Sequence, residues 1–309
     1  MSSPRASMML SVVLVSGLSL ACGSGTSEQP TPTAPGLPQP ACPYDPIAIV
    51  VTVDQWGDIV EQLAGGCGDV TTIIEGTSGD PHDYEPTPGD NAAFTDAELV
   101  VMNGLDYDHW AEDALDALST RPTVVNAGEV AELTEGDNPH VWYEPRYIHL
   151  VAAQVANQLM TLRPEAAAYF STRQTAWEAA LQPYSDRIET IRTEHAGTPY
   201  AATESVFDYM ARSLQFDDLT PAGYRNAVAN ESEPAPGDLL EFEDAFRAGR
   251  IRVLVFNTQT EGALTDQLRQ VAEDADVPVV EVTETVPAGL TFIAWQLGQL
   301  DALAAALTA

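Results

Sequence analysis

The run Ile47–Val53 is the feature that most constrains the fold, because all but one of its residues are apolar. A strand with one exposed face alternates apolar and polar residues, whereas this run is typical of a parallel strand buried on both faces. Residues 54–64 then carry an amphipathic helical pattern that ends at Gly65 and Gly66. Strand and helix patterns continue to alternate, with further strands predicted at 70–74, 98–104 and 123–126 and helices at 87–96 and 107–118. This order predicts parallel βα units.

The longest helical pattern, about Glu165 to His195, has no strand beside it and is a candidate connector between two lobes. Pro183 interrupts the pattern, so we expect a kink or a break there. Before the connector a helix is predicted at 146–162. Beyond the connector the alternation resumes, with strands predicted at 200–203, 251–256 and 278–282 and helices at 205–214, 237–248, 263–274 and 291–307. The predicted class is α/β, with two lobes that each contain a mostly parallel sheet flanked by helices, joined by a long connecting helix. The predicted boundaries are 44–162 for the N-terminal lobe, 163–196 for the connector and 197–309 for the C-terminal lobe.

The chain is strongly acidic, with a formal net charge of −33 over 309 residues. All 13 basic residues are arginine, since the sequence contains no lysine. Phosphate groups repel such a surface, so nucleic acid is excluded as a partner. A negative field concentrates cations, although solubility in a salty habitat would by itself explain the charge.

The N-terminal residues predict export. Arg5 precedes an apolar run, Met8 to Ala21, which is too short for a comfortable membrane span and is typical of a signal peptide, predicted at residues 1–21. The small residue before Cys22, followed by Gly-Ser-Gly, resembles a bacterial lipoprotein processing site, although Ser19 stands where leucine is usual. We therefore expect lipidation of Cys22, with plain secretion as the alternative. Residues 22–43, largely Ser, Thr, Pro and Gly, predict a flexible tether.

The two remaining cysteines, Cys42 and Cys67, predict one disulfide bond in an exported chain. A cysteine metal site is the weaker alternative, because the sequence has no closely spaced cysteine pair.

Two loops contain a Pro-His dipeptide among acidic residues and end in proline. They are Gly79–Pro86, which contains His82, and Asp137–Pro145, which contains His140. Proline stiffens the chain next to each histidine, and histidine is the commonest metal-ligating side chain. Two such loops predict one site with two imidazoles.

Two glutamates follow predicted strands of the second lobe. Glu204 comes directly after 200–203, and Glu284 follows 278–282. Ligands of open parallel sheets bind beyond the carboxyl ends of the strands, so these side chains and the two histidines would meet in a cleft between the lobes. Two nitrogen and two oxygen donors suit a divalent transition metal. Taken singly, each residue also has an ordinary structural explanation, such as a solvated loop histidine or a helix-capping glutamate.

Several segments together resemble a known family, the cluster A-I solute-binding proteins of bacterial zinc and manganese ABC transporters, also called the zinc-uptake and manganese-adhesin lipoproteins. The segments that carry the resemblance are Asp80–Pro86, Asn138–Trp142, Leu99–Gly104 and Thr283–Pro287. The resemblance extends from about Ile47 to the C-terminus. It implies two α/β lobes joined by a rigid helix, with one metal ion between them.

The resemblance also implies a ligand set. His82 and His140 match the two histidine ligands, and Glu204, within Thr203–Tyr209, matches the third ligand, which is glutamate in manganese members. Glu284 stands where the family usually has aspartate, and Glu281 is the alternative for this fourth ligand. The remaining histidines do not match ligand positions and are interpreted as structural or surface residues; they are His109, His149 and His195.

The function implied is capture of one divalent metal ion outside the membrane and its delivery to an ABC-type permease with a separate ATPase, since this chain has no P-loop. The two carboxylates favour manganese over zinc, with ferrous iron as a third candidate cargo. We expect a monomer, exported and either anchored to the outer face of the cell membrane through the lipid or held in the periplasm, and no enzymatic activity.

Two alternatives belong to other classes of protein. One is an adhesin-like surface lipoprotein in which the metal only stabilises the fold. The other is a secreted zinc metallohydrolase, which four protein ligands and the lack of a His-Glu-x-x-His pattern disfavour.

Overall fold

The computed structural model describes residues 36–37, 40–76, 81–230, 232–260 and 262–308. The predicted signal peptide, Cys22 and most of the predicted tether lie outside the described residues, as do Gly79 and Asp80 of the first Pro-His loop. Within the described part of the chain, no helix has both the length and the apolar character needed to span a membrane.

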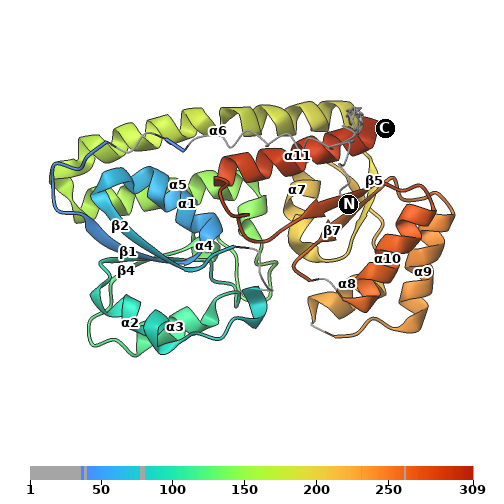
Figure 1. Cartoon of the computed structure of the whole chain (residues 1–309), viewed down its shortest axis with the longest axis horizontal. Helices are drawn as coiled ribbons and strands as arrows, with labels where there is room; N and C mark the ends of the chain where they lie inside the picture. Colours follow the sequence, from blue (N-terminus) through green and yellow to red (C-terminus); the bar gives the residue numbers. More distant parts are fainter. Residues whose placement is uncertain (1–35, 38–39, 77–80, 231, 261, 309) are drawn as a thin grey trace, which may run out of the picture. The chain divides into compact units, whose positions relative to one another are not determined.

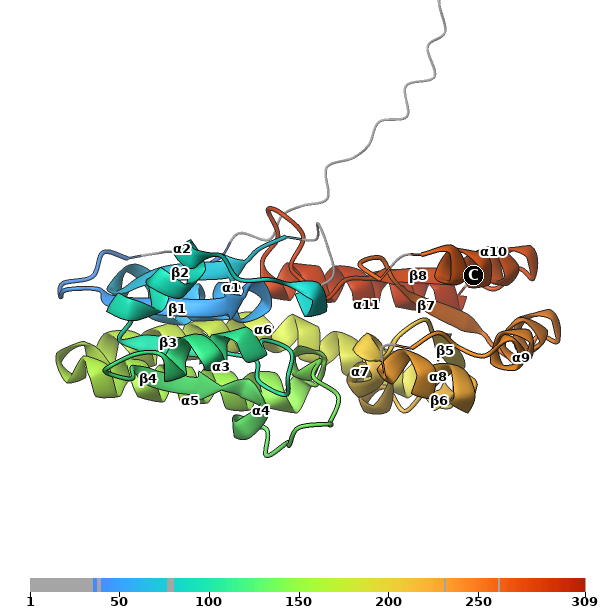
Figure 2. The ribbon, with the colours of Figure 1, turned by 90° about the horizontal axis from the view of Figure 1, so that it is seen from below.

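The first sheet of the structure in Figure 1 contains four parallel strands, and their order, β2-β1-β3-β4, can be followed in Figure 2. Their bounds are β1 Ile47–Val53, β2 Gly68–Ile74, β3 Leu99–Met102 and β4 Thr123–Asn126. Strand β3 ends earlier than predicted, because the N–H groups of Asn103 and Gly104 donate to the carboxylate of Asp108 instead of extending the sheet.

Both faces of this sheet are buried, as the apolar run of β1 predicts. Ile49 and Val51 lie in a core with α1 (Asp54–Ala64) and α5 (Pro145–Leu162). Val50 points to the opposite face, where it packs in a separate cluster with Phe94 and Trp110. The helices on this second face are α2 (Pro88–Ala93) and α3 (His109–Asp116), and the short α4 (Ala127–Val130) follows β4. We define the sheet and these helices as the first lobe.

The second sheet repeats the arrangement with parallel strands in the order β6-β5-β7-β8. The bounds are β5 Pro199–Ala202, β6 Asp217–Asp218, β7 Val253–Asn257 and β8 Val279–Val282, with helices α7 Asp208–Ser213, α8 Ala222–Ala229, α9 Pro236–Arg247 and α10 Ala263–Asp274. Ala201 and Leu254 face a core with α8, α9 and α10. This sheet and its helices are the second lobe, and the two sheets confirm the predicted fold class.

Three elements were not predicted: α4, β6 and α8. Strand β6 is two aspartates long and pairs only with the start of β5, so it has no apolar run for a sequence pattern to detect. Helix α8 buries one side chain of its eight, Tyr224, which is too few to define a periodicity.

The predicted connector is the 29-residue helix α6 (Ala167–His195), and it continues through Pro183, so the predicted break does not occur. Proline removes the hydrogen bond to the carbonyl of Ala179, but Ala179 and Pro183 are both exposed, so water can hydrate that carbonyl. On the opposite side Trp177, Leu181 and Tyr184 are fully buried, and this packing keeps the helix continuous.

A second helix, α11 (Phe292–Thr308), also passes along both lobes (Figures 1 and 2). At its start the N–H of Phe292 donates to the carboxylate of Asp58 in α1, and further along Asp301 pairs with Arg187 of α6. One apolar core therefore runs from β1 through α6 and α11 to β7. The cysteines Cys42 and Cys67 form a disulfide bond at the edge of the first lobe.

Candidate metal-binding site

The two Pro-His loops place their histidines at the side of the first lobe that faces the second. His82 lies in a short 3-10 turn, Pro81–Asp83, that follows β2. His140 lies directly before another such turn, Val141–Tyr143, in the connection between α4 and α5. In the second lobe Glu204 follows β5 and Glu284 follows β8. Parallel strands end at one edge of a sheet, which brings the two glutamates together.

The four side chains converge. His140 Nε2 lies 3.4 Å from Glu204 Oε1 and 3.5 Å from Glu284 Oε2. His82 Nε2 lies 3.5 Å from the same Glu284 oxygen. Ligand atoms of His82, His140 and Glu284 all lie within 4.8 Å of one another, a spacing at which one ion can contact all three.

Asn138 orients the imidazole of His140. The Asn138 side-chain oxygen accepts the backbone N–H of His140 and lies 2.8 Å from its Nδ1. An amide oxygen can only accept, so Nδ1 carries a proton and Nε2 is the nitrogen that faces the carboxylates. Asn138 also reaches the second lobe, since its amide donates to the backbone carbonyl of Ser205.

The buried Nε2 of His140 makes no hydrogen bond to any described residue. Its nearest polar neighbours are two carboxylate oxygens. A nitrogen that faces two carboxylates in a buried site needs a cation between them, either a proton on the nitrogen itself or a metal ion. The residues present therefore fit a divalent metal ion.

Aromatic rings support both histidines from within the first lobe. Tyr107 packs edge-on against His82 with ring centroids 4.7 Å apart, and Trp142 packs against His140 at 5.3 Å. Tyr107 and Trp142 contact each other, so the two imidazoles share one aromatic support. The Tyr107 hydroxyl also donates to Glu284 Oε2 at 3.0 Å and so connects the lobes.

The four residues differ in exposure. The side chain of Glu284 is completely buried, those of His140 and Glu204 are 2% and 10% exposed, and that of His82 is 29% exposed. His82 is therefore the most exposed of the four residues.

The charges of the cluster are strongly coupled. Burial lowers the pKa of His140, but the carboxylates of Glu204 and Glu284 outweigh burial and raise this pKa above its ordinary value. Burial raises the pKa of Glu204. Burial alone would also raise the pKa of Glu284, but the two histidines hold it below its ordinary value. Two carboxylates in a buried site need a positive charge beside them. A proton on His140 provides this charge when no metal ion is bound.

A family model described as "Zinc-uptake complex component A periplasmic" matches residues 49–306, which is most of the chain. The chain belongs to this zinc-uptake component A family. Membership confirms the predicted resemblance and the prediction of an extracytoplasmic metal-binding component of ABC transport that is not an enzyme. The secreted metallohydrolase alternative is thereby excluded.

Individual relatives are distant and differ in the metal they are named for. The chain is 23% identical to the high-affinity zinc uptake system protein ZnuA of Bacillus subtilis, over 72% of this chain and 75% of that one. It is 22% identical to the manganese ABC transporter substrate-binding lipoprotein PsaA of Streptococcus mitis, over 88% of this chain and 85% of that one. The solved periplasmic zinc-binding protein TroA of Treponema pallidum shares the fold, with a TM-score of 0.73 at 20% identity over 85% of this chain and 99% of that one.

The other glutamate and histidines considered as possible metal ligands lie outside the four-residue cluster. Glu281 points outward from β8 and pairs with Arg269 at 2.6 Å. His109 is exposed beside Asp106, His149 packs near Trp177, and His195 lies near Glu194.

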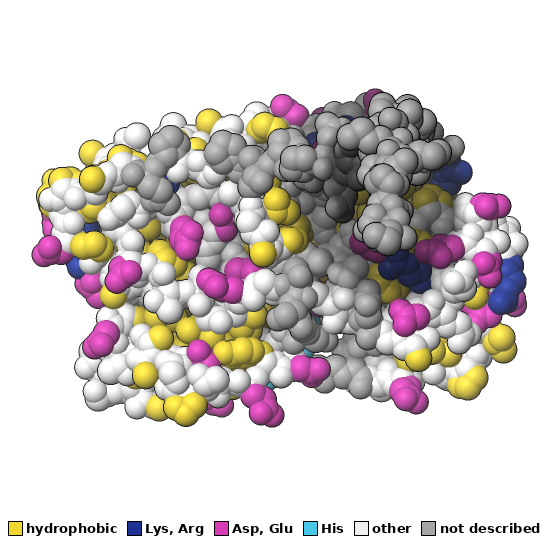
Figure 3. Space-filling view, in the orientation of Figure 1, with side chains coloured by type: hydrophobic (Ala, Val, Ile, Leu, Met, Phe, Trp, Pro, Cys, Tyr) yellow, Lys and Arg dark blue, Asp and Glu magenta, His cyan; other side chains and the backbone are white. Residues whose placement is uncertain are grey.

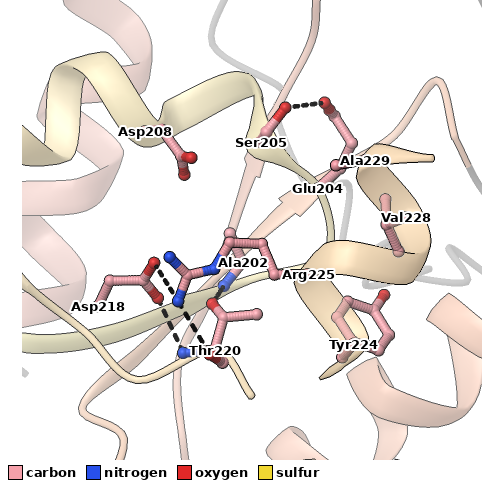
Figure 4. Close-up of a pocket in the computed structure, with 10 residues that line it drawn as sticks. All are labelled: Ala202, Glu204, Ser205, Asp208, Asp218, Thr220, Tyr224, Arg225, Val228 and Ala229. Atoms are coloured by element: carbon pink, nitrogen blue, oxygen red, sulfur yellow. Dashed lines mark hydrogen bonds and ion pairs between the residues drawn. The ribbon is translucent and has the colours of Figure 1, made fainter. Parts of the chain in front are cut away.

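Beside Glu204 the second lobe contains a small cavity of about 10 Å³ that is lined by both polar and apolar side chains (Figure 4). Ser205 donates to Glu204 Oε1 at 3.2 Å, while the nearby cation Arg225 pairs with Asp218 at 3.0 Å. Arg225 therefore offsets the charge of Asp218, and among the described residues it forms no ion pair with Glu204.

Sequence reasoning assigned no role to several residues that contact the cluster, among them Asn138, Tyr107 and Asn257. Asn257 donates to both glutamates from the end of β7. A signal for Asn257 existed, because this residue directly follows the strand predicted at 251–256, as Glu204 and Glu284 follow theirs. Asn138 stands two residues before His140, and nothing in the sequence marks Tyr107.

Proposed function

We propose that this chain captures one divalent transition metal ion outside the membrane and delivers it to the permease of an ABC transporter whose ATPase is a separate chain. His82, His140, Glu204 and Glu284 are the proposed ligands. The observation that carries the proposal is the convergence of two imidazoles from one lobe and two carboxylates from the other on a buried position where His140 Nε2 has no hydrogen-bond partner among the described residues.

The charge of the cluster supports a divalent cargo. Two neutral imidazoles and two carboxylates carry a net charge of −2, which a divalent cation would neutralise. Burying carboxylates without a partner is costly, and Glu284 is fully buried. The acidic side chains spread over the visible face of both lobes (Figure 3) would favour the approach of cations over anions.

Within this function we propose manganese as the favoured cargo over zinc, with iron as a third candidate. Oxygen donors suit harder cations, and two of the four proposed donors are carboxylates. Zinc generally binds the same ligands more tightly than manganese, so the cargo depends on relative affinities and on the supply of each metal. Both metals occur in the names of the relatives described above.

The test is a competition titration of the metal-free mature domain. Tryptophan fluorescence is followed while Mn(II) and Zn(II) are added singly and then together, and elemental analysis gives the stoichiometry. We expect one equivalent of either metal, with tight binding lost in Glu204→Ala. Absence of saturable binding by any of Mn(II), Zn(II) or Fe(II) would remove the transport function and favour the adhesin-like surface protein.

We further propose that the mature protein is a monomer tethered to the membrane through a lipid on Cys22. The lipoproteins among its relatives support the tether, and the predicted processing site supports the position.

A further inference from the structure

One amide nitrogen joins the two carboxylates of the cluster. Asn257 Nδ2 donates to Glu204 Oε2 at 2.9 Å and to Glu284 Oε1 at 2.8 Å. The order of the strands explains this position: β7 lies between β5 and β8, so its last residue stands between the glutamates that follow its two neighbours.

The orientation of this amide is determined by its surroundings. Asn257 is completely buried, and its side-chain oxygen accepts the backbone N–H of Gln259 at 3.0 Å. Its own backbone N–H donates to the Thr203 hydroxyl. Since an N–H must face an acceptor, the oxygen is committed to Gln259 and the NH₂ group faces the carboxylates.

The amide occupies a particular oxygen of each glutamate. The oxygens that face the histidines are Glu204 Oε1 and Glu284 Oε2. Asn257 holds the other oxygen of each carboxylate. These two hydrogen bonds fix the rotation of the carboxylates, so that each glutamate turns one oxygen toward the imidazoles and the cluster supplies four donor atoms in total.

We propose that Asn257 is a specificity-determining residue which limits both glutamates to one-oxygen ligation and thereby sets the ratio of manganese to zinc affinity. This inference rests on the proposed function. Four donors match the tetrahedral preference of zinc, whereas manganese favours a larger, mainly oxygen shell that two-oxygen ligation by each glutamate would help to supply. The Asn257 amide therefore opposes the manganese preference that the two carboxylates confer. Removing the amide makes the second oxygen of each carboxylate available to the metal.

The experiment compares Mn(II) and Zn(II) affinities of wild type, Asn257→Ala and Asn257→Ser. In Asn257→Ala we expect the manganese-to-zinc affinity ratio to rise by about tenfold, which corresponds to about 1.4 kcal/mol of relative binding free energy. Asn257→Ser retains one hydroxyl donor, which can hold only one carboxylate, so its ratio should lie between the other two. If Asn257→Ala does not fold, the affinity ratio of Asn257→Ser tests the proposal instead.

Tyr107→Phe is the matched control. It removes a hydrogen bond to Glu284, but at the oxygen that faces the histidines, so both affinities should change in parallel and the ratio should stay constant. Cobalt(II) provides a second readout, because tetrahedral cobalt(II) absorbs visible light far more strongly than the six-coordinate ion. We expect strong bands in wild type and weaker bands in Asn257→Ala.

The outcomes separate the two proposals. If wild type binds neither metal, the proposed function and this inference both fail. If wild type binds both metals, but the affinity ratio and the cobalt spectrum of a folded Asn257 variant match those of wild type, the specificity role alone is overturned.

Discussion

The two lobes contribute to the cluster in different ways. The first lobe presents imidazoles from loops stiffened by proline and packed against Tyr107 and Trp142. The second lobe presents carboxylates directly from strand ends, held by the hydrogen bonds of Asn257. Neutral imidazoles can be supported by ring packing, whereas buried carboxylates need N–H and O–H donors to offset the loss of water. The chemistry of each ligand type thus determines the kind of scaffold around it.

The largest effect is expected where the first lobe loses a ligand. Among the described residues, His140 is the only histidine whose imidazole contacts both Glu204 and Glu284. His140→Ala removes this imidazole, so metal affinity should fall by at least about 100-fold. Isothermal titration of the metal-free protein measures this change. His109→Ala, at an exposed histidine of the same lobe, should bind as wild type does. A His140→Ala protein with nearly unchanged affinity would refute the ligand set.

A smaller effect is expected from the residue that orients that imidazole. Asn138→Ala removes the acceptor for His140 Nδ1–H and should lower the affinity for either metal about 10- to 100-fold. Asn138→Asp keeps an acceptor and should recover part of the loss. Because Asn138 orients a nitrogen donor and holds no carboxylate oxygen, the manganese-to-zinc ratio should stay constant, unlike that of Asn257→Ala. A large change in the manganese-to-zinc affinity ratio of Asn138→Ala would mean that the choice of metal does not depend on the second lobe alone.

The smallest effect is expected for the stability contribution of Asp54, whose carboxylate joins the two lobes beside the cluster. Asp54, at the start of α1, accepts the backbone N–H groups of Val286 and Gly76 at 2.9 and 2.7 Å. Burial raises the pKa of Asp54 to about 6, although these N–H groups oppose the rise. Since this pKa exceeds that of the unfolded chain, near 4, the contribution of Asp54 to stability is greatest below about pH 4 and is lost as pH rises through about 6.

Denaturant unfolding of wild type and Asp54→Asn at pH 4.5 and pH 7 tests this sign. Relative to the variant, wild type should lose about 1–2 kcal/mol of unfolding free energy between the two pH values. The comparison with the variant cancels the titration of groups that do not interact with Asp54. Parallel pH profiles of the two proteins would show that Asp54 does not titrate in this range.

Much of the fold could be read from local patterns. The runs at Ile47–Val53 and Thr123–Asn126 and the helix at 263–274 were predicted at their observed bounds. Prediction failed where the local signal was short, as in β6. Of the kink or break expected at Pro183, the break does not occur, because packing keeps α6 continuous. The four predicted ligands converge in the structure because strand ends and Pro-His loops are local features with a known place in parallel sheets. Their role as ligands remains a prediction.

The sequence by itself therefore determined the class of fold, the division into βα units and the residues that can bind a metal, because each follows from periodicity or residue type within a short segment. Only the tertiary structure decided which partners those residues meet. Asn257 lies 53 residues from Glu204 in the chain, Tyr107 lies 177 from Glu284, and Asp54 lies 232 from Val286. Such contacts depend on strand order and on how the lobes pack, and no local pattern encodes either.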